Sequence, residues 1–318
     1  MSNVKPEHKS VLLEQVVKYA MPENGRVFVD GTFGLGGHTR AILKAYPSIK
    51  LAIGIDRDAE ILGYARETFD EQRLSLYQAN ASDLPMVLEN AGVNGADGIL
   101  LDLGVSSYQL DNPDRGFSFS KPGPLDMRMN PNEGETAADL VNTLSKGDLE
   151  KIIFEYGEER YGRKIAEAIV NFRATKPFET TDELSKVICD VVPSLPPSKK
   201  HIHPATRTFQ ALRIAVNHEL DEVADFLEIA LSCLNPGGHL NIISFHSLED
   251  RLVKNFVQKN LKGCECPPQF PVCVCGKKPT ISLLTRKPIF ADDDEIAVNP
   301  RSRSARLRSI KKLGKEGK

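Results

Sequence analysis

A glycine-rich segment carries the residues best suited to hold a ligand against the backbone. Residues 29–38 read VDGTFGLGGH and stand between an apolar run and a helical pattern. Glycine adopts positive φ and lets a ligand approach closely, while the first N–H groups of a helix face that ligand. A dinucleotide fingerprint that starts at Gly34 would have Thr39 at its last glycine position, and no Lys is present for a nucleotide-triphosphate loop. The segment therefore favours a nucleoside cofactor without a pyrophosphate.

Two aspartates follow buried strand patterns and belong with this segment. Asp56 ends the second apolar run, about 20 residues after the glycines, where a carboxylate accepts from both ribose hydroxyls. The alternative role for Asp56 is to cap the next helix, but Asp58 already stands at that cap. Asp102 ends the fourth apolar run. Because the carboxyl ends of parallel strands line one crevice, we expect both aspartates beside the glycine loop.

The elements that position these residues alternate along the first hundred residues. Strand patterns at 26–30, 51–56, 74–77 and 97–103 are separated by helical patterns at 38–46 and 58–69, after a short helix at 10–20 capped by Ser10. Such alternation predicts a parallel sheet covered on both faces.

The alternation stops between about 105 and 215 and then resumes. Helical patterns at 148–156, 163–172 and 181–191 are joined by connections that contain Pro and Gly. A long helix at 206–234, a turn at 235–238, a strand at 239–245 and a helix capped by Ser247 follow. The sequence predicts an α/β, Rossmann-like sheet with an inserted all-helical subdomain. We expect one discontinuous domain of residues 1–105 and 215–318, and an inserted domain of residues 106–214.

Composition and charge narrow the class of protein. Of 318 residues, 41% are hydrophobic and 26% charged, and no apolar run approaches the ~20 residues that span a bilayer. The N-terminus is polar where a signal peptide is apolar, so we expect a soluble, cytoplasmic protein. Residues 301–318 carry a net charge of +7, so the other 300 carry −9 of the total of −2. This basic tail suits phosphate binding, or it is a solvated, frayed terminus. Nothing in the sequence indicates an oligomeric state.

Polar side chains in the helical segment and near the fifth strand are candidates for substrate contact. A basic stretch at 199–213 suits phosphates better than a merely solvated face. Asp126 and Arg128, which flank Met127, could hydrogen-bond a base and a phosphate, or they form a local salt bridge. A histidine after the fifth strand has a substrate role or a structural one. The candidates are Asp126, Arg128, Arg207, Arg213 and His246.

The six cysteines fall into two groups. Two Cys-x-Cys pairs could close a tetrahedral zinc site with four thiolates, or they remain reduced thiols in a structured loop. A cytosolic chain makes disulfides unexpected. The other two cysteines lie in helical patterns and are assigned to the core, and none is assigned to catalysis. The Cys-x-Cys pairs are Cys264 with Cys266 and Cys273 with Cys275. The cysteines in helical patterns are Cys189 and Cys233.

Seven motifs together resemble one family, that of ribosomal RNA small subunit methyltransferase H. The resemblance extends from residue 8 to about residue 303, essentially the whole chain. The motifs are HKSVLL (8–13), DGTFGLGGH (30–38), LLDLGVSS (100–107), RGFSF (115–119), PLDMRM (124–129), HPATRTFQ (203–210) and ISFHSLEDR (243–251).

The resemblance implies a class I S-adenosylmethionine-dependent methyltransferase with a helical domain after the fourth strand. Its substrate would be 16S ribosomal RNA, either free or in the assembled small ribosomal subunit, methylated on N4 of a cytidine in the decoding centre. This sequence departs from the family in having alanine at 81, where a bulky apolar residue packs on adenine, and Tyr108 in place of proline. The cofactor contacts that the resemblance implies are Gly36, Gly37, His38, Asp56, Ala81, Asp102 and Gln109.

The reaction needs an acceptor for an amine hydrogen. The exocyclic N4 of cytosine is a poor nucleophile, and a carboxylate or carbonyl that accepts from N4–H stabilises the developing positive charge. The amine must also lie ~3–3.5 Å from the methyl group, which requires a splayed-out base. Asp102, or a carbonyl in the loop after it, is the candidate, and the group that finally removes the proton stays open.

Three other classes are weighed against this one. An NAD-dependent oxidoreductase lacks its third glycine here. An RNA-binding ribosome-assembly protein without catalysis would not need Asp56 and the glycine loop together. A DNA amino-methyltransferase often has Asp/Asn-Pro-Pro-aromatic, whereas residues 102–105 read DLGV.

Overall fold

The computed structural model describes residues 9–193, 203–264, 266–267, 269–272 and 274–314. Cα packing divides the chain into two compact units, Met1–Gly104 with Leu220–Lys318, and Val105–Glu219. The expected inserted segment 106–214 falls within the second unit. Several residues singled out above lie outside the described ones: Lys199, Lys200, His201, Cys273 and the last four residues of the basic tail.

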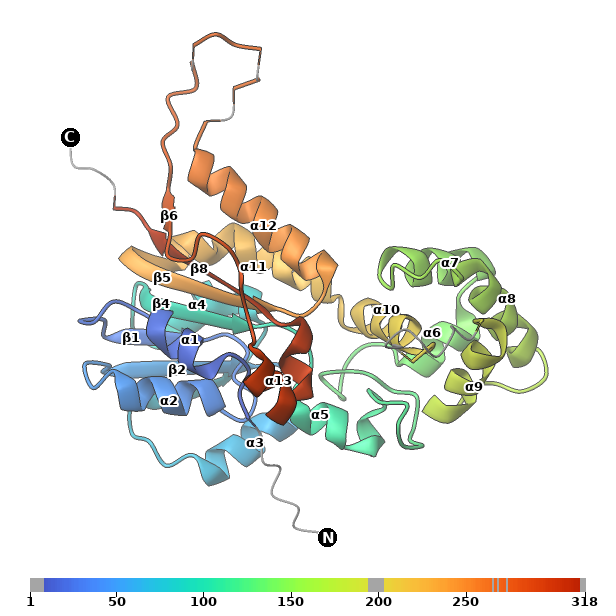
Figure 1. Cartoon of the computed structure of the whole chain (residues 1–318). Coiled ribbons are helices and arrows are strands. Elements are labelled where there is room, and N and C mark those ends of the chain that lie inside the picture. Colours follow the sequence, from blue (N-terminus) through green and yellow to red (C-terminus); the bar gives the residue numbers. More distant parts are fainter. Residues whose placement is uncertain (1–8, 194–202, 265, 268, 273, 315–318) are drawn as a thin grey trace. The chain divides into compact units, whose positions relative to one another are not determined.

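The first unit is built on a single mixed sheet (Figure 1). Its strands are β1 (Val27–Asp30), β2 (Leu51–Asp56), β3 (Leu74–Gln78), β4 (Ala96–Asp102), β5 (Leu234–Ser244), β6 (Ile281–Leu283), β7 (Ile289–Phe290) and β8 (Arg306–Lys312). The order is β3-β2-β1-β4-β5-β8-β6, with β7 also paired to β8. Strands β1 to β5 are mutually parallel, and β8 runs antiparallel to β5, β6 and β7. The order 3-2-1-4-5 is that of a Rossmann-like fold, which confirms the predicted fold class.

The alternation of side chains along each strand supplies two apolar faces. Val29, Ile53 and Ile99 pack in one cluster with residues of α4 (Leu84–Asn90), α11 (Glu219–Cys233) and α12 (Ser247–Lys262). Phe28 and Leu100, one residue away, pack in another cluster with α1 (Leu13–Tyr19) and α2 (Gly37–Ala45). Successive strand residues point to opposite faces, so nearly continuous apolar strands are buried on both. A smaller cluster joins Phe33 to α3 (Ala59–Thr68).

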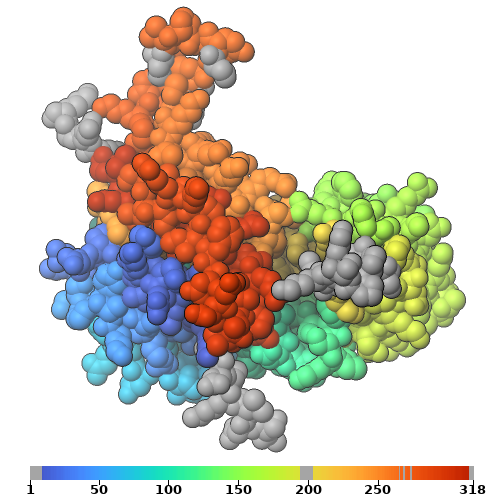
Figure 2. Space-filling model, in the orientation of Figure 1, coloured from blue at the N-terminus to red at the C-terminus, as the bar shows by residue number. Residues whose placement is uncertain are grey.

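The N-terminal segment contacts the segment around residues 293–299 on the first unit. The remaining elements here are η1 (Ala81–Asp83), α13 (Asp293–Val298) and η3 (Pro300–Ser304). Glu295 Oε1 accepts from Leu12 N at 2.7 Å, and Asn299 Nδ2 donates to Lys9 O at 3.0 Å. Figure 2 shows the orange-red segment around α13 lying beside the blue N-terminal part. Within the described residues, no helix has the length and apolarity to cross a membrane.

The second unit is helical. It comprises α5 (Ser107–Asp111), η2 (Pro113–Arg115), α6 (Ala137–Thr143), α7 (Lys146–Glu155), α8 (Gly162–Arg173), α9 (Thr181–Val191) and α10 (Thr206–Asn217). Its described residues contain no strand, only an isolated bridge between Pro124 and Thr180. Apolar side chains such as Phe178 and Leu212 form a core separate from those of the sheet, which lets this unit pack on its own.

Four local predictions were wrong, each at an element boundary. Ser10 does not cap α1, because Leu12 stands at the cap with φ of 51° and no side-chain bond. The helix expected at 206–234 is two helices, since His218 adopts φ of 48° between them. Residues 235–238 form the irregular start of β5 rather than a separate turn, with a register shift in its pairing to β4. His246, not Ser247, caps α12.

Part of the basic tail, Arg306–Lys312, is strand β8 of the sheet, which corrects the expectation that this part is a frayed terminus. Leu307 and Ile310 of β8 are buried. Arg308 donates to Asp250 through Nε at 2.8 Å and Nη2 at 3.2 Å, and Arg306 Nη1 lies 3.5 Å from the same carboxylate. Both arginines are engaged by the single carboxylate of Asp250, so only one net positive charge of the three groups is left.

Candidate functional site

Three aspartates end neighbouring parallel strands of the first unit. Asp30 ends β1, Asp56 ends β2 and Asp102 ends β4, and β1 pairs with both of the others. The carboxyl edge of the sheet therefore gathers three acids, as predicted for two of them. At such an edge a Rossmann-like sheet binds its ligand.

The glycine loop connects β1 to α2 along this edge. Gly34 and Gly36 have φ of 55° and 73°, values that L residues rarely adopt, and Gly36 is the N-cap of α2. A Cβ at Gly36 would lie 2.6 Å from Phe33 Cζ, so that position also lacks space for a side chain. Gly36 makes no side-chain cap, so no side chain of the cap residue competes with a ligand at the start of α2.

Asp56 connects the glycine loop to the next helix. Its Oδ2 accepts from Gly34 N and its Oδ1 from Asp58 N, each at 2.9 Å. Burial raises the pKa of Asp56 to about 6, which these hydrogen bonds oppose only in part. Asp58 caps α3 by accepting from Glu60 N at 3.1 Å, as predicted. Asp56 is therefore not needed for the cap, which supports the proposed ribose contact.

Asp102 carries an unusual buried oxygen. Its Oδ1 is buried and has no hydrogen-bond partner among the described residues. Burial, followed by repulsion from Asp30 and Glu249, raises the pKa of Asp102 well above its ordinary value. A buried polar atom without a partner costs about 1–3 kcal/mol, more when it is charged. Such a cost at a ligand edge points to a partner that arrives with a ligand.

His38 is oriented beside this carboxylate. Its Nε2 lies 2.8 Å from Val11 O, and since a carbonyl only accepts, Nε2 carries the hydrogen. Its Nδ1 lies 3.7 Å from Asp102 Oδ2. The ring is buried, so its orientation is fixed by the loop around Val11 rather than by solvent. The structure thus places His38 and Asp102 together, as the resemblance implied.

Two threonines of the same motif were not singled out from the sequence. Thr32 Oγ1 accepts from Asp102 N at 2.6 Å, and Thr39 Oγ1 donates to Asp30 Oδ2 at 2.7 Å. Both tie a strand end to the glycine loop. Their position inside the 30–38 motif and next to it was the available signal. Ala81 opens η1 after β3, and a Cβ built on Gly31 would lie 3.6 Å from its Cβ, so it lines the same loop.

Gln109 lies in the second unit and forms a capping box with Ser106. Ser106 Oγ accepts from Gln109 N at 3.2 Å, and Gln109 Oε1 accepts from Ser106 N at 3.1 Å. The side chain is buried and has a local role as a cap. Its contact with the cofactor stays a prediction.

Asp126 and Arg128 form the local salt bridge that was the alternative to substrate contact. Two guanidinium nitrogens, Nε and Nη2, donate to the two carboxylate oxygens at 2.9 and 2.7 Å. Met127 between them has φ of 64°, and Asn217 Nδ2 donates to its carbonyl at 2.8 Å. Arg115 Nη2 donates to the carbonyl of Arg128 at 2.9 Å. This loop is rigidly held, and a contact with RNA stays a prediction.

The other candidates differ in how available their side chains are. Arg207 is half exposed, with Nη1 donating to Glu158 O at 3.1 Å. Arg213 is mostly buried and binds Glu219 through Nε at 2.7 Å and Nη2 at 2.8 Å. A phosphate would have to displace that carboxylate, so we assign Arg213 a structural role instead of the expected RNA contact. His246 is partly buried at the cap of α12, where its Nδ1 accepts from Glu249 N at 3.4 Å, and a substrate contact stays a prediction.

The fold and the carboxyl edge of the sheet together indicate a class of cofactor-binding protein. A Rossmann-like sheet, a glycine loop without a pyrophosphate fingerprint and a strand-end aspartate suit a nucleoside cofactor such as S-adenosylmethionine. The residues present fit that group: N–H donors at α2, a carboxylate at Asp56 and an unpaired carboxylate oxygen at Asp102.

Comparison with known proteins identifies the family. Residues 5–313 match the MraW methylase family, and the chain belongs to it. A protein of Syntrophotalea carbinolica named ribosomal RNA small subunit methyltransferase H is 50% identical over 311 residues, covering 96% of this chain and 98% of that one. A protein of Citrifermentans bemidjiense with the same name is 49% identical over 308 residues, covering 96% and 98%. The chain is therefore an S-adenosylmethionine-dependent methyltransferase.

Solved structures resemble this one only weakly. A putative methyltransferase from Streptococcus mutans in complex with SAH has a TM-score of 0.42 and 12% identity, covering 96% of this chain and 100% of that one. A putative rRNA-methylase from Clostridium thermocellum has a TM-score of 0.42 and 10% identity, with the same coverage. The family assignment rests on the sequence matches.

Proposed function

We propose that this protein transfers a methyl group from S-adenosylmethionine to N4 of a cytidine in the decoding centre of 16S ribosomal RNA. The relatives named ribosomal RNA small subunit methyltransferase H, matched over nearly their full length, support the substrate. The observation that carries the chemistry is the buried Asp102 Oδ1, which has no partner within the described residues. Because that substrate is made and used in the cytoplasm, we place the protein there too.

Asp102 is the proposed acceptor for the amine. S-adenosylmethionine supplies an electrophilic methyl group when it is bound. When the cytosine amine donates one N–H to Asp102 Oδ1, the buried oxygen gains a hydrogen-bond partner. The same hydrogen bond helps to localise the lone pair on N4 instead of in the ring. The interaction strengthens as the nitrogen becomes positive, so it favours the transition state over the bound substrate. The Nδ1 atom of His38 lies 3.7 Å from the second oxygen, Oδ2.

The remaining residues of the edge hold the cofactor. Asp56 accepts from the ribose hydroxyls in addition to its two backbone donors. The Gly36–Gly37–His38 segment lies at the amino-acid part, because a carboxylate is favoured at a helix N-terminus. Ala81 contacts the adenine only through its small side chain and backbone. These roles follow from the order of the elements along the edge of the sheet.

A matched pair of variants on one strand tests the proposed role. Asp102→Asn removes the negative charge at the carboxyl end of β4, and Asp97→Asn removes one at its amino end. Asp97 accepts from Arg26 N at 2.7 Å and from Val27 N at 3.0 Å. Each variant is incubated with labelled S-adenosylmethionine and small subunits that lack the modification. Affinity for S-adenosylhomocysteine is measured separately.

We expect Asp102→Asn to lower single-turnover transfer by about 10²–10³-fold, the usual effect of losing one such group, while Asp97→Asn stays near wild type. A loss of cofactor affinity that accounts for the whole drop would reduce Asp102 to a cofactor ligand. If the wild-type protein binds the cofactor but transfers no methyl group to subunits or to naked RNA, the proposed substrate is refuted. A ribosome-assembly protein without catalysis would give that last result.

A further inference from the structure

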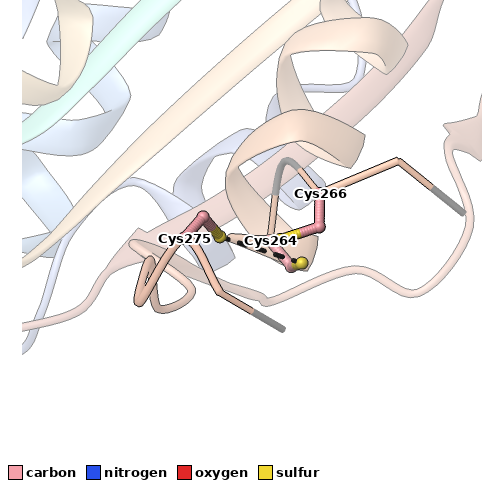
Figure 3. A group of neighbouring side chains, drawn as sticks. All are labelled: Cys264, Cys266 and Cys275. Carbon is pink, nitrogen blue, oxygen red and sulfur yellow. Dashed lines mark hydrogen bonds between the residues drawn. The ribbon is translucent and has the colours of Figure 1, made fainter. Parts of the chain in front are cut away.

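A cluster of thiols lies outside the cofactor edge, in the connection from α12 to β6. Residues 263–280 leave the end of α12, project away from the sheet of the first unit and return to β6 (Figures 1 and 2). Cys264, Cys266 and Cys275 come together near the base of this loop (Figure 3). Their three Sγ atoms all lie within 4.8 Å of one another. The methyl-transfer site uses none of them.

The spacing of the sulfurs matches a metal-thiolate site. With Zn–S bonds of about 2.3 Å, two ligands of a tetrahedral site lie about 3.8 Å apart. Cys264 Sγ and Cys275 Sγ are 3.9 Å apart. A disulfide would need them at about 2.05 Å. The geometry therefore resembles two ligands of one ion and is too wide for a bond between the sulfurs.

A backbone hydrogen bond to sulfur provides a second observation. Val274 N donates to Cys266 Sγ at 3.3 Å, across eight residues of the loop. Metal-bound ligands are characteristically oriented by such outer hydrogen bonds, and a thiolate accepts them better than a thiol. Gly263, with φ of 69°, ends α12 and turns the chain so that Cys264 directly follows the helix.

The loop has little else to hold its conformation. Its apolar side chains point outward: Phe270, Val272 and Val274 are 51%, 70% and 73% exposed. Among the described residues of 263–280, none belongs to one of the four apolar clusters. Segments that cannot bury apolar surface are ordered by cross-links or metals instead. The converging thiols are the candidate for that cross-link.

We propose that Cys264, Cys266 and Cys275 bind a structural Zn²⁺ ion as thiolates. Each thiol loses its proton to solvent as its sulfur–zinc bond forms, so binding releases one proton per ligand thiol that was protonated. Tetrahedral zinc requires a fourth ligand. The paired Cys-x-Cys pattern offers Cys273, whose position lies outside the described residues. Thiolate ligands and a tetrahedral arrangement suit zinc over magnesium, calcium or manganese.

The first experiment measures metal content on the full chain purified without chelators. We expect about one zinc per chain and negligible iron by mass spectrometry. Replacing zinc by Co²⁺ should give the visible absorption of a tetrahedral thiolate complex, a readout that does not involve methyl transfer. Cys264→Ser and Cys275→Ser should each lower zinc content severalfold. Cys189→Ser, which removes a half-buried thiol in α9, is the matched control and should keep its zinc.

Two further measurements use only the wild-type protein, so they do not depend on whether a cysteine variant folds. They are the removal of zinc with a chelator and the titration of free thiols. Denatured wild-type protein should expose all six thiols once zinc is chelated. Loss of two thiols to a disulfide, a content below about 0.1 zinc per chain after exposure to zinc, or stoichiometric iron would each overturn the proposal. Cys273→Ser that lowers zinc content would support four thiolates. Unchanged zinc in that variant would still support the site, with a fourth ligand other than Cys273.

Discussion

Two glycines of the cofactor loop give a quantitative test, because they share a backbone conformation but not an environment. Gly34 and Gly36 both have positive φ, at 55° and 73°. A Cβ at Gly36 would lie 2.6 Å from Phe33 Cζ and 2.7 Å from Phe69 Cε2. A Cβ at Gly34 would meet only Thr32 O, at 3.9 Å. Alanine at either position thus pays the same backbone cost, and only Gly36→Ala adds a steric one.

The magnitudes follow from these contacts. A left-handed conformation costs an L residue about 1–2 kcal/mol, partly offset by the about 0.4–1 kcal/mol gained from a stiffer unfolded chain. Gly34→Ala should therefore destabilise the first unit by about 1 kcal/mol. Overpacking against the two phenyl rings adds about 1–3 kcal/mol, so Gly36→Ala should cost about 2–4 kcal/mol. The rings cannot move freely, since Arg40 stacks on Phe69 with its guanidinium 4.1 Å from the ring centre.

The assay is hydrogen exchange as a function of urea, followed on peptides from residues 31–45. This readout reports the loop and α2 without a contribution from the helical unit. Affinity for S-adenosylhomocysteine should fall at least tenfold in Gly36→Ala, because the N–H groups of α2 are displaced. Equal destabilisation by the two variants would refute the reasoning, since the steric difference would then have no effect.

Three further predictions concern the acids and a buried ion pair. Asp56→Ala should weaken S-adenosylhomocysteine binding by about 10–100-fold. Since the pKa of Asp56 is raised to about 6, the affinity of the wild-type protein should also fall as pH drops through about 6. Calorimetry at pH 5 and 8 measures that affinity, and equal values at the two pH values would contradict the prediction. The raised pKa of Asp102 means that the acceptor is protonated at low pH, so single-turnover transfer should rise with pH, and a profile that falls would exclude a carboxylate acceptor. Glu219→Ala should destabilise the helical unit by about 3–5 kcal/mol because it removes the carboxylate that pairs with Arg213 in a mostly buried position. The double variant with Arg213→Met should recover part of the loss in urea unfolding.

The aspartates at the carboxyl edge of the sheet could be predicted because the patterns that mark them lie close to them in the sequence. Asp56 follows an apolar run and has Asp58 beside it to serve as the cap, so its separate role could be inferred from the sequence. Asp102 likewise ends a strand. The partners of these acids were less visible, because Thr32 reaches Asp102 across 70 residues of sequence. Nothing local marks a hydroxyl for such a contact.

The errors arose where tertiary packing overrides local pattern. Neither Gly nor Pro marks the break at His218, which adopts a left-handed conformation between two helices. The basic residues of 306–312 hide a strand, because Arg306 and Arg308 share an ion pair with Asp250, 56 and 58 residues earlier in the sequence. Arg213 was predicted to contact RNA, and its ion pair with Glu219, which favours a structural role, is visible only in the structure.

The most direct test of the proposed function is the identity of the methylated nucleoside. Small subunits that lack the modification are incubated with the protein and deuterated-methyl S-adenosylmethionine, and the RNA is digested and analysed by mass spectrometry. The mechanism predicts the deuterated methyl on N4 of cytidine, at one nucleotide of the decoding centre. Deuterium on C5, on a ribose 2′-oxygen or on another base would contradict it, because Asp102 would then have no amine hydrogen to accept.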